Sequence, residues 1–316
     1  MRSFGADSTT AEVLDGIDLR GKVVLVTGAS GGLGAETARA LAATGAAVVL
    51  TARDVPKGEA VAQAIRASTG NGRVEVEELE LGSLSSVRAC ARRVLARHTT
   101  LHILVNNAGV MACPFGKTAE GYELQFGTNH LGHFLLTCLL VPALRRGAPS
   151  RIVCLTSGGH RASPVVFEDI HFAQRPYDKW LSYGQAKTAN VLFVVELERR
   201  LGAAGIHAYA VHPGMIATEL SRHMTQEDFE LLQTQMAGMQ WHSKTVESGA
   251  ATTVYAATAP ELEGRGGVYI EDCRVAAVKD GPRDSGGVRS YALDPALARR
   301  LWTVSEDLVG ERFELA

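Results

Sequence analysis

The sequence predicts an α/β fold built on one doubly wound parallel sheet with helices on both faces, and three observations lead to it. Apolar, β-branched runs alternate with longer segments of helical period along most of the chain. One strand and one helix together take about 25–30 residues, as in βαβ units. Most of the apolar runs are continuous, which is typical of strands covered on both faces. Right-handed crossovers then place helices on both sides of the sheet.

Six strands are expected, at 23–27, 47–51, 74–80, 102–106, 152–156 and 206–212. The expected helices are 32–43, 57–68, 84–97, 119–145, 183–201, 245–258 and 294–308. No Pro-, Gly- or Ser-rich linker and no repeat divides the 316 residues, so we expect a single domain, although the length also allows two. Its expected parts are an N-terminal extension (1–20), an inserted loop (158–182), a substrate lid (215–245) and a C-terminal extension (271–316) with an irregular tail at 271–287.

Composition excludes several classes of protein. With 46% hydrophobic and 21% charged residues, the chain is neither disordered nor fibrous. A net charge of −2 without a Lys/Arg cluster argues against a nucleic-acid partner. The most apolar stretch, 131–144, is shorter than the roughly 20 residues of a membrane span, and the acidic N-terminus lacks the apolar core of a signal peptide. The five scattered cysteines favour a reducing, cytoplasmic location over disulfides or structural zinc.

A glycine-rich segment, TGASGGLG at 27–34, follows the first strand and leads into a helix. Such a turn directs backbone N–H groups and the positive end of the helix to one point, where a pyrophosphate can bind. In this arrangement Gly28 makes the tight turn, Gly32 permits close approach of the ligand, and Gly34 lets the helix lie near the strand. Ser30 can add a hydroxyl to a phosphate. An ordinary βα turn is the alternative, but the position after the first strand favours a nucleotide.

Together with this loop, an ordered set of motifs resembles the short-chain dehydrogenase/reductase superfamily. The set runs from about Thr10 to the C-terminus and consists of NNAG at 106–109, Asn129, Ser157, YGQAK with Tyr183 and Lys187, and His212-Pro213-Gly214. The resemblance implies a Rossmann-type sheet and an oxidoreductase that transfers a hydride between NAD(P) and a carbonyl compound or alcohol. Within the superfamily, LTARD, TNHLGHF and YIEDCR…YALDP…LW resemble the carbonyl reductase and retinol dehydrogenase branches.

The candidate catalytic residues are Asn129, Ser157, Tyr183 and Lys187. Tyr183 and Lys187 are four residues apart on an expected helix, so both project from one face. An ammonium about 4 Å from the phenol would lower the phenol pKa by about three units, to near neutrality, and prepare it for proton transfer. The resemblance implies that Ser157 orients the substrate oxygen and that Asn129 holds a water by interrupting its helix. Each residue alone could be an ordinary turn or surface residue, but the ordered set favours catalysis.

The end of the second strand bears on the choice of cofactor. NAD-preferring enzymes place a carboxylate there to bind the ribose 2′-OH, whereas this chain has Ala52 followed by Arg53. Because a guanidinium can pair with a 2′-phosphate, we expect a preference for NADP(H) over NAD(H), with Lys57 as a second candidate cation. The alternative is that Arg53 is solvated and pairs with Asp54.

The resemblance implies the other cofactor contacts. Glu80 stands where the family usually has Asp, so Glu80 and Leu81 are expected near the adenine. The segment 213–218 is expected to meet the carboxamide end of nicotinamide, where the backbone near Ile216 and the Thr218 hydroxyl would hold the ring. The full set of expected cofactor contacts is Gly28, Ser30, Gly32, Leu33, Arg53, Glu80, Leu81, Asn107, Ala108, Gly109, Tyr183, Lys187, Pro213, Gly214, Ile216 and Thr218.

The resemblance also implies a lipophilic carbonyl compound or alcohol as substrate, such as a steroid, a retinoid, or an aromatic or aliphatic ketone. The expected pocket walls are 110–115, the loop after Ser157, and 215–241. Their apolar side chains indicate an adaptable pocket under a lid, with core packing as the alternative. These side chains are Met111, Phe115, Met215, Met224, Phe229, Met236 and Met239.

The remaining expectations concern metals, assembly and other functions. The HLGH segment with His130 and His133 lacks the spacing and acidic neighbour of a zinc helix, so both residues are expected to pack or lie at the surface, and no metal is expected. The 26 residues from Ser157 to Tyr183 add a loop before the helix that commonly packs in family dimers, and both monomer and homodimer stay open. A non-catalytic NADP(H)-sensing regulator would lack the Tyr/Lys pair. A sugar-nucleotide epimerase or dehydratase would show TGxxGxxG and a larger C-terminal domain.

Overall fold

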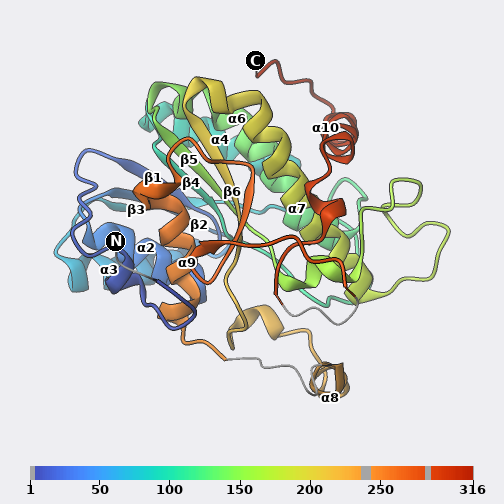
Figure 1. Cartoon of the computed structure of the whole chain (residues 1–316). Coiled ribbons are helices and arrows are strands. Elements are labelled where there is room, and N and C mark those ends of the chain that lie inside the picture. The colour runs from blue at the N-terminus through green and yellow to red at the C-terminus, as the bar shows by residue number, and fades with distance from the viewer. Residues whose placement is uncertain (1–3, 236–242, 282–285, 316) are drawn as a thin grey trace.

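The computed structural model describes residues 4–235, 243–281 and 286–315, and it confirms the α/β fold predicted from the sequence (Figure 1). Its strands form an eight-stranded sheet in the order β3-β2-β1-β4-β5-β6-β7-β8. Neighbouring strands are parallel except for β8, which runs antiparallel to β7. The strands are β1 (Val23–Val26), β2 (Ala47–Ala52), β3 (Val74–Glu78), β4 (Ile103–Asn106), β5 (Ser150–Leu155), β6 (Ile206–His212), β7 (Val268–Glu271) and β8 (Arg274–Val275).

The central strands are buried along nearly their whole length, as their continuous apolar runs predict. Every residue of β4 and β5 is buried, while β1, β2 and β6 each have a single half-buried residue at one end. Because β1, β4, β5 and β6 are parallel neighbours, their carboxyl ends lie along one edge of the sheet. The glycine-rich loop, the NNAG segment, Ser157 and the Pro213-Gly214 turn therefore meet at that edge.

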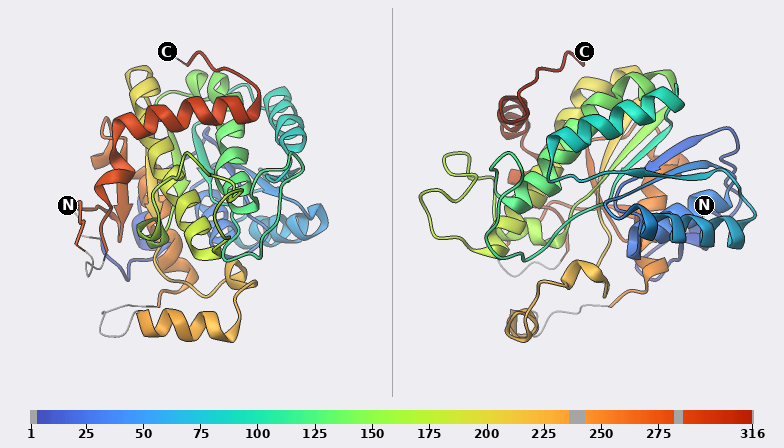
Figure 2. Two further views of the ribbon diagram at one scale, coloured as in Figure 1. Left: turned by 90° about the vertical axis from the view of Figure 1, so that its right-hand side faces the viewer. Right: turned by 180° about the vertical axis from the view of Figure 1, so that it is seen from behind.

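Two helical layers cover the sheet (Figures 1 and 2). The first packs over an apolar core that includes Val24, Leu41 and Val254, and the second over a core that includes Phe134, Leu192 and Trp302. The first layer contains α1 (Thr10–Val13), α2 (Gly32–Ala43), α3 (Val55–Thr69) and α9 (Val246–Thr258). The second layer contains α4 (Leu84–Arg97), α6 (Gly132–Arg146), α7 (Lys179–Leu201) and α10 (Pro295–Val309).

Two strands were not expected from the sequence. β7 has four residues, and β8 has two residues that are both exposed, so neither presents an apolar run long enough to be recognised. The prediction that 271–287 is irregular throughout is therefore wrong, because β8 forms within it. Pairing with β6 on one side and β8 on the other stabilises β7 instead.

Two helix starts differ from the prediction by at least four residues. The helix predicted at 119–145 begins later, as α5 (Leu124–Phe126), because the Glu123 carboxylate accepts hydrogen bonds from the backbone N–H groups of Gln125 and Phe126 at 2.9 and 2.7 Å. It continues through a π-helical segment (Gly127–Leu131) into α6. By contrast, α7 begins at Lys179, four residues before the predicted start, because Asp178 caps it.

The predicted lid and inserted loop contain little regular structure. Within the lid lies α8 (Gln226–Gln235), which stands away from the sheet in both views of Figure 2, and residues 236–242 of the lid lie outside the described ranges.

Of the chain that the structure describes, no helix combines the length and hydropathy needed to span a membrane. The short 3₁₀ turns are Gly158–Ala162, Gly202–Ala204, Glu219–Ser221, Pro260–Leu262 and Ser290–Leu293.

Candidate active site

The glycine-rich loop is packed too tightly for side chains at two of its positions. Gly28 has a φ of 65°, and a Cβ there would lie 2.7 Å from the Ala108 Cβ. At Gly34 a Cβ would lie 2.5 Å from both the Gly28 carbonyl oxygen and the Asn107 Nδ2. Asn107 and Ala108 hold the loop from the other side, since their backbone N–H groups donate to Thr27 Oγ1 at 2.9 and 3.0 Å.

The start of α2 is free to bind an anion. Its N-cap residue, Gly31, has no side chain that could cap the first N–H groups, and no acidic residue lies in the first turn. A Cβ at Gly31 would meet open space, whereas one at Gly32 would lie 3.5 Å from the Thr218 Cγ2. The N–H groups of the first turn, the positive helix end and the space beside the Thr218 side chain suit a pyrophosphate. The residues present therefore fit a dinucleotide cofactor.

Gly109 joins the loop region to the candidate catalytic residues. A Cβ there would lie 3.1 Å from Asn129 Oδ1 and 3.7 Å from Lys187 Nζ. Asn129 sits in the π-helical segment, so its helix is interrupted as the resemblance implied. Its carboxamide exchanges two hydrogen bonds with the backbone of Val110, at 2.8 and 2.9 Å. This side chain therefore fixes the NNAG segment against the helix, a structural contact that sequence reasoning missed.

Ser157 and Tyr183 lie next to each other. Ser157 Oγ accepts a hydrogen bond from the Gly159 N–H at 3.0 Å, and a Cβ at Gly159 would lie 2.9 Å from Tyr183 Cε1. Tyr183 is 5% exposed. Burial raises the pKa of Tyr183 to about 12, and a hydrogen bond with Ser157 counteracts part of this rise.

Lys187 is buried beside this pair. Its Nζ lies 5.6 Å from the centre of the Tyr183 ring and donates to the Leu155 carbonyl oxygen at 3.1 Å. Burial lowers the pKa of Lys187 to about 8. The expected acidification of the phenol to near neutrality is therefore wrong, because burial of the phenol dominates and only the hydrogen bond with Ser157 opposes it.

The cations expected near the adenosine ribose lie at the surface. Arg53 Nη1 is 3.5 Å from Glu80 Oε2, so the partner of Arg53 is Glu80 and not Asp54, whose side chain caps α3. Lys57 Nζ is 3.0 Å from the Glu219 carboxylate. Weakly held, exposed ion pairs of this kind can exchange partners at small energetic cost. Leu81 is buried, and a Cβ at Gly132 would touch its carbonyl oxygen.

The segment after β6 is held by a lysine that sequence reasoning missed. Gly214 has a φ of 98°, and a Cβ there would lie 2.7 Å from the Lys244 Cδ. Lys244 Nζ donates to Asp272 Oδ1 at 2.6 Å, so the ion pair links this segment to the β7–β8 turn. Ile216 and Leu33 both lie over Gly249 of α9, where a Cβ would be 2.6 Å from the Ile216 Cγ1 and 2.8 Å from the Leu33 Cδ2. Nothing in the sequence around Lys244 indicated this ion pair.

Both histidines of HLGH are buried, in agreement with the packing interpretation. His130 Nε2 lies 2.8 Å from Ser305 Oγ. His133 Nδ1 lies 3.0 Å from the Asn129 carbonyl oxygen, and its Nε2 lies 2.9 Å from Thr27 Oγ1. Among the described residues, no group of three or more His, Cys, Asp or Glu side chains is arranged to hold a metal ion.

Several of the apolar residues expected to form the substrate pocket are exposed. Phe115 is 50% exposed and stacks edge-on against Tyr177, with ring centres 5.2 Å apart. Met215 and Phe229 are 38% and 43% exposed, which argues against core packing for these residues. Met111 and Met224 are half-buried, while Met236 and Met239 lie outside the described ranges.

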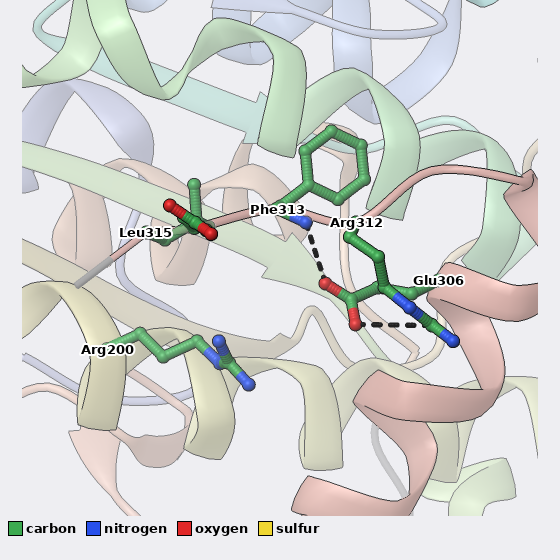
Figure 3. A pocket seen from close by; sticks show the side chains of 6 residues that line it. Arg200, Glu306, Arg312, Phe313 and Leu315 are labelled. Carbon is green, nitrogen blue, oxygen red and sulfur yellow. Dashed lines mark hydrogen bonds and ion pairs between the residues drawn. The ribbon is translucent and has the colours of Figure 1, made fainter.

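One surface hollow lies beside this group, and another lies at the C-terminal tail. A hollow of about 380 Å³ is bounded by Pro114, Tyr177, Asp178, Lys179, Trp180, Asp228 and Leu231, where α8 meets the start of α7. A larger hollow of about 470 Å³ is formed by the end of α10 and the C-terminal tail (Figure 3). There Glu306 accepts a hydrogen bond from the Phe313 N–H at 2.8 Å, and Arg312 lies 3.5 Å away. None of the candidate catalytic residues lines either hollow.

Comparison with known proteins gives consistent matches. The short chain dehydrogenase family model matches residues 22–228. Human retinol dehydrogenase 11 is 44% identical over 298 residues, which cover 93% of this chain and 87% of that protein. An uncharacterised protein of Mycobacterium paratuberculosis has a solved structure with 37% identity and a TM-score of 0.74, covering 98% of this chain and all of that one. A short chain dehydrogenase of Burkholderia cenocepacia, solved with NADP, has 27% identity and a TM-score of 0.63, covering 80% and 96%.

Proposed function

The chain belongs to the short-chain dehydrogenase family and is an oxidoreductase that interconverts alcohols and carbonyl compounds; on this premise we propose that it uses NADP(H) and acts on a lipophilic substrate. The observation that carries the proposal is the joint burial of Tyr183 and Lys187 beside Ser157 and Gly109. This arrangement brings a phenol, a hydroxyl and an ammonium to the sheet edge where the glycine-rich loop can hold a dinucleotide.

Each of these side chains has a proposed task in carbonyl reduction. NADP(H), when bound, supplies the hydride, and the protein must supply the proton. Tyr183 keeps its proton at neutral pH because its pKa is about 12, so the phenol donates it to the carbonyl oxygen as charge develops there. Ser157 donates a hydrogen bond to the same oxygen. Lys187, buried 5.6 Å from the ring centre, stabilises the phenolate that remains.

The cofactor preference is proposed from the surface charges around β2. Arg53 and Lys57 are the cations at this point, and each has an exposed carboxylate partner, Glu80 and Glu219. A 2′-phosphate would offer both cations a more highly charged partner than a carboxylate. Ala52 leaves no anion at the end of β2 to repel that phosphate.

The substrate class is proposed from the exposed apolar side chains of the lid and the loop after β4, and from the similarity to retinol dehydrogenase 11. We propose the segments 215–245 and 158–178 as lid and inserted loop of one domain spanning 1–316, because residues 179–182 of the loop predicted at 158–182 belong to α7. The five cysteines are buried free thiols, which supports a reducing, cytoplasmic location.

Tyr183→Phe tests the proposed reaction. We expect the variant to bind NADPH with unchanged affinity, measured by NADPH fluorescence, and to lose about 10³-fold in NADPH oxidation with ketones, aldehydes, retinoids and steroid ketones. Tyr255→Phe, which removes a hydroxyl from α9, is the matched control and should keep full turnover. Full turnover by the Tyr183 variant would contradict the mechanism.

Arg53→Ala tests the cofactor preference. We expect the ratio of NADPH to NADH affinity to fall about tenfold, because one charge-assisted hydrogen bond to the 2′-phosphate is lost. The control is Arg20→Ala, since Arg20 is an exposed arginine paired with Asp18 far from β2. An unchanged ratio would remove Arg53 from the proposed site.

A further inference from the structure

The turn that carries Ser157 is closed by a buried histidine. The Ser157 carbonyl oxygen accepts two hydrogen bonds from His160, one from its backbone N–H at 3.0 Å and one from its Nδ1 at 2.8 Å. Ser157 Oγ accepts the Gly159 N–H at 3.0 Å within the same turn. The backbone and side chain of Ser157 are therefore both fixed by the three residues that follow it.

A residue of the C-terminal extension sets the tautomer of that histidine. The backbone N–H of Arg289 donates to His160 Nε2 at 3.1 Å. A backbone amide nitrogen can only donate, so Nε2 is unprotonated and Nδ1 carries the hydrogen that Ser157 accepts. His160 is fully buried, its ring lies 5.1 Å from that of Tyr269, and burial lowers its pKa to about 4. The ring is thus neutral at physiological pH and its two nitrogens have opposite roles.

The same histidine ties the turn to α7. Its carbonyl oxygen accepts hydrogen bonds from Thr188 Oγ1 at 3.0 Å and from the Tyr291 hydroxyl at 2.7 Å. Thr188 follows Lys187 directly, and Figure 1 shows the red segment before α10 beside α7. A shift of the turn would therefore move Ser157 relative to both Tyr183 and Lys187.

We propose that His160 is a positioning residue for the reaction: its Nδ1–H holds the Ser157 carbonyl, and the Arg289 backbone N–H, supplied by the C-terminal extension, keeps that hydrogen on Nδ1. The proposal rests on the proposed function of Ser157. It assigns the C-terminal extension a role in shaping the site, although no residue of that extension was expected to contact it.

Two substitutions separate the two nitrogens of His160. His160→Asn places an amide N–H where Nδ1 stood, and His160→Gln places an amide oxygen where Nε2 stood. We expect H160N to keep kcat for carbonyl reduction within about threefold of the wild type and H160Q to lose about 30-fold, because a displacement near 1 Å of a group at the reacting centre can cost about 100-fold. The KM for NADPH and the melting temperature should be alike in the two variants.

A double-mutant cycle with Ser157→Ala tests whether the effect passes through Ser157. In the S157A background, H160Q should lower kcat by no more than about twofold, since the group that it displaces is already missing. Substitution of Arg289 tests the same hydrogen bond without changing His160. Its φ of −74° suits proline, so Arg289→Pro removes the N–H donor with little strain, and Arg289→Ala is the matched control. We expect kcat of R289P to be below about one third of that of R289A.

The outcomes divide clearly. A wild type without carbonyl turnover would overturn the proposed function and, with it, this proposal. With an active wild type, equal kcat values for H160N and H160Q, or an equal loss from H160Q with and without Ser157, would overturn the positioning role alone. If H160Q does not fold, the ratio of the kcat of R289P to the kcat of R289A tests the proposal instead. Equal kcat values for these two variants would overturn the positioning role.

Discussion

Replacing Lys187 by Met is expected to stabilise the folded protein while abolishing turnover. Lys187 is 4% exposed, and burial lowers its pKa from 10.5 to about 8. One pKa unit corresponds to about 1.4 kcal/mol, so keeping this ammonium charged in the folded state costs about 3 kcal/mol at neutral pH. The variant also loses the hydrogen bond to the Leu155 carbonyl oxygen, worth about 1 kcal/mol. The net expectation is a gain of about 2 kcal/mol in the free energy of unfolding at pH 7.

The stability difference between K187M and the wild type should depend on pH, and the lowered pKa of Lys187 sets the direction. Between pH 8 and 10.5 the unfolded chain binds more protons at Lys187 than the folded chain, so wild-type stability rises with pH relative to the Met variant. The advantage of K187M is therefore full below pH 8 and shrinks above it, by about 2 kcal/mol at pH 9.5. Comparing the two proteins at each pH cancels the contributions of the other titrating groups.

Urea unfolding followed by tryptophan fluorescence at pH 7 and pH 9.5 measures both quantities. Lys117→Met is the control, because Lys117 is exposed and its removal should change stability little at either pH. The reasoning is refuted if K187M is no more stable than the wild type at pH 7, or if its advantage is the same at both pH values.

Two further predictions concern pH and the glycine-rich loop. In carbonyl reduction, kcat/KM should be constant below pH 8 and fall above it, because Lys187 loses its proton there while Tyr183, with a pKa of about 12, stays protonated. A kcat/KM that stays constant up to pH 9.5, measured by stopped flow, would contradict this. Gly34→Ala should lower NADPH affinity at least about tenfold and also lower the melting temperature, because its Cβ would lie 2.5 Å from the Gly28 carbonyl oxygen. Gly72→Ala is the control: a Cβ at Gly72 faces open space, so neither quantity should change. Calorimetric titration of both variants with NADPH provides the check.

The sequence was sufficient for the parts of the fold that depend on local pattern. The six expected strands are all present, since short, continuous apolar runs such as 152–156 are typical of strands in a sheet covered on both faces. The pair β7–β8 was missed because its stability comes from pairing with β6, a partner about 60 residues away in the chain, rather than from its own residues. The late start of α5 depends on Glu123, whose side chain caps the helix. The helical pattern of the sequence extends back to residue 119 and gave no sign of this cap.

The candidate site also has parts that the local sequence predicted and parts that depend on the tertiary structure. Motif order alone indicated Ser157, Tyr183 and Lys187, and the structure brings them together. The electrostatic expectation failed because a pairwise attraction was weighed without the cost of burying both groups. Long-range partners, such as Asp272 for Lys244 or Arg289 for His160, follow only from the tertiary structure, because nothing in the local pattern of either residue specifies them.

The packing of α10 limits how two molecules could associate. Trp302 is 2% exposed and lies against Phe134 and Phe193, while the Arg200 guanidinium stacks 4.2 Å from its ring. The outer surface of α7 is thus already occupied by the chain's own C-terminal helix. A symmetric pair of subunits joined through this surface would first have to detach α10 and leave a large indole in water.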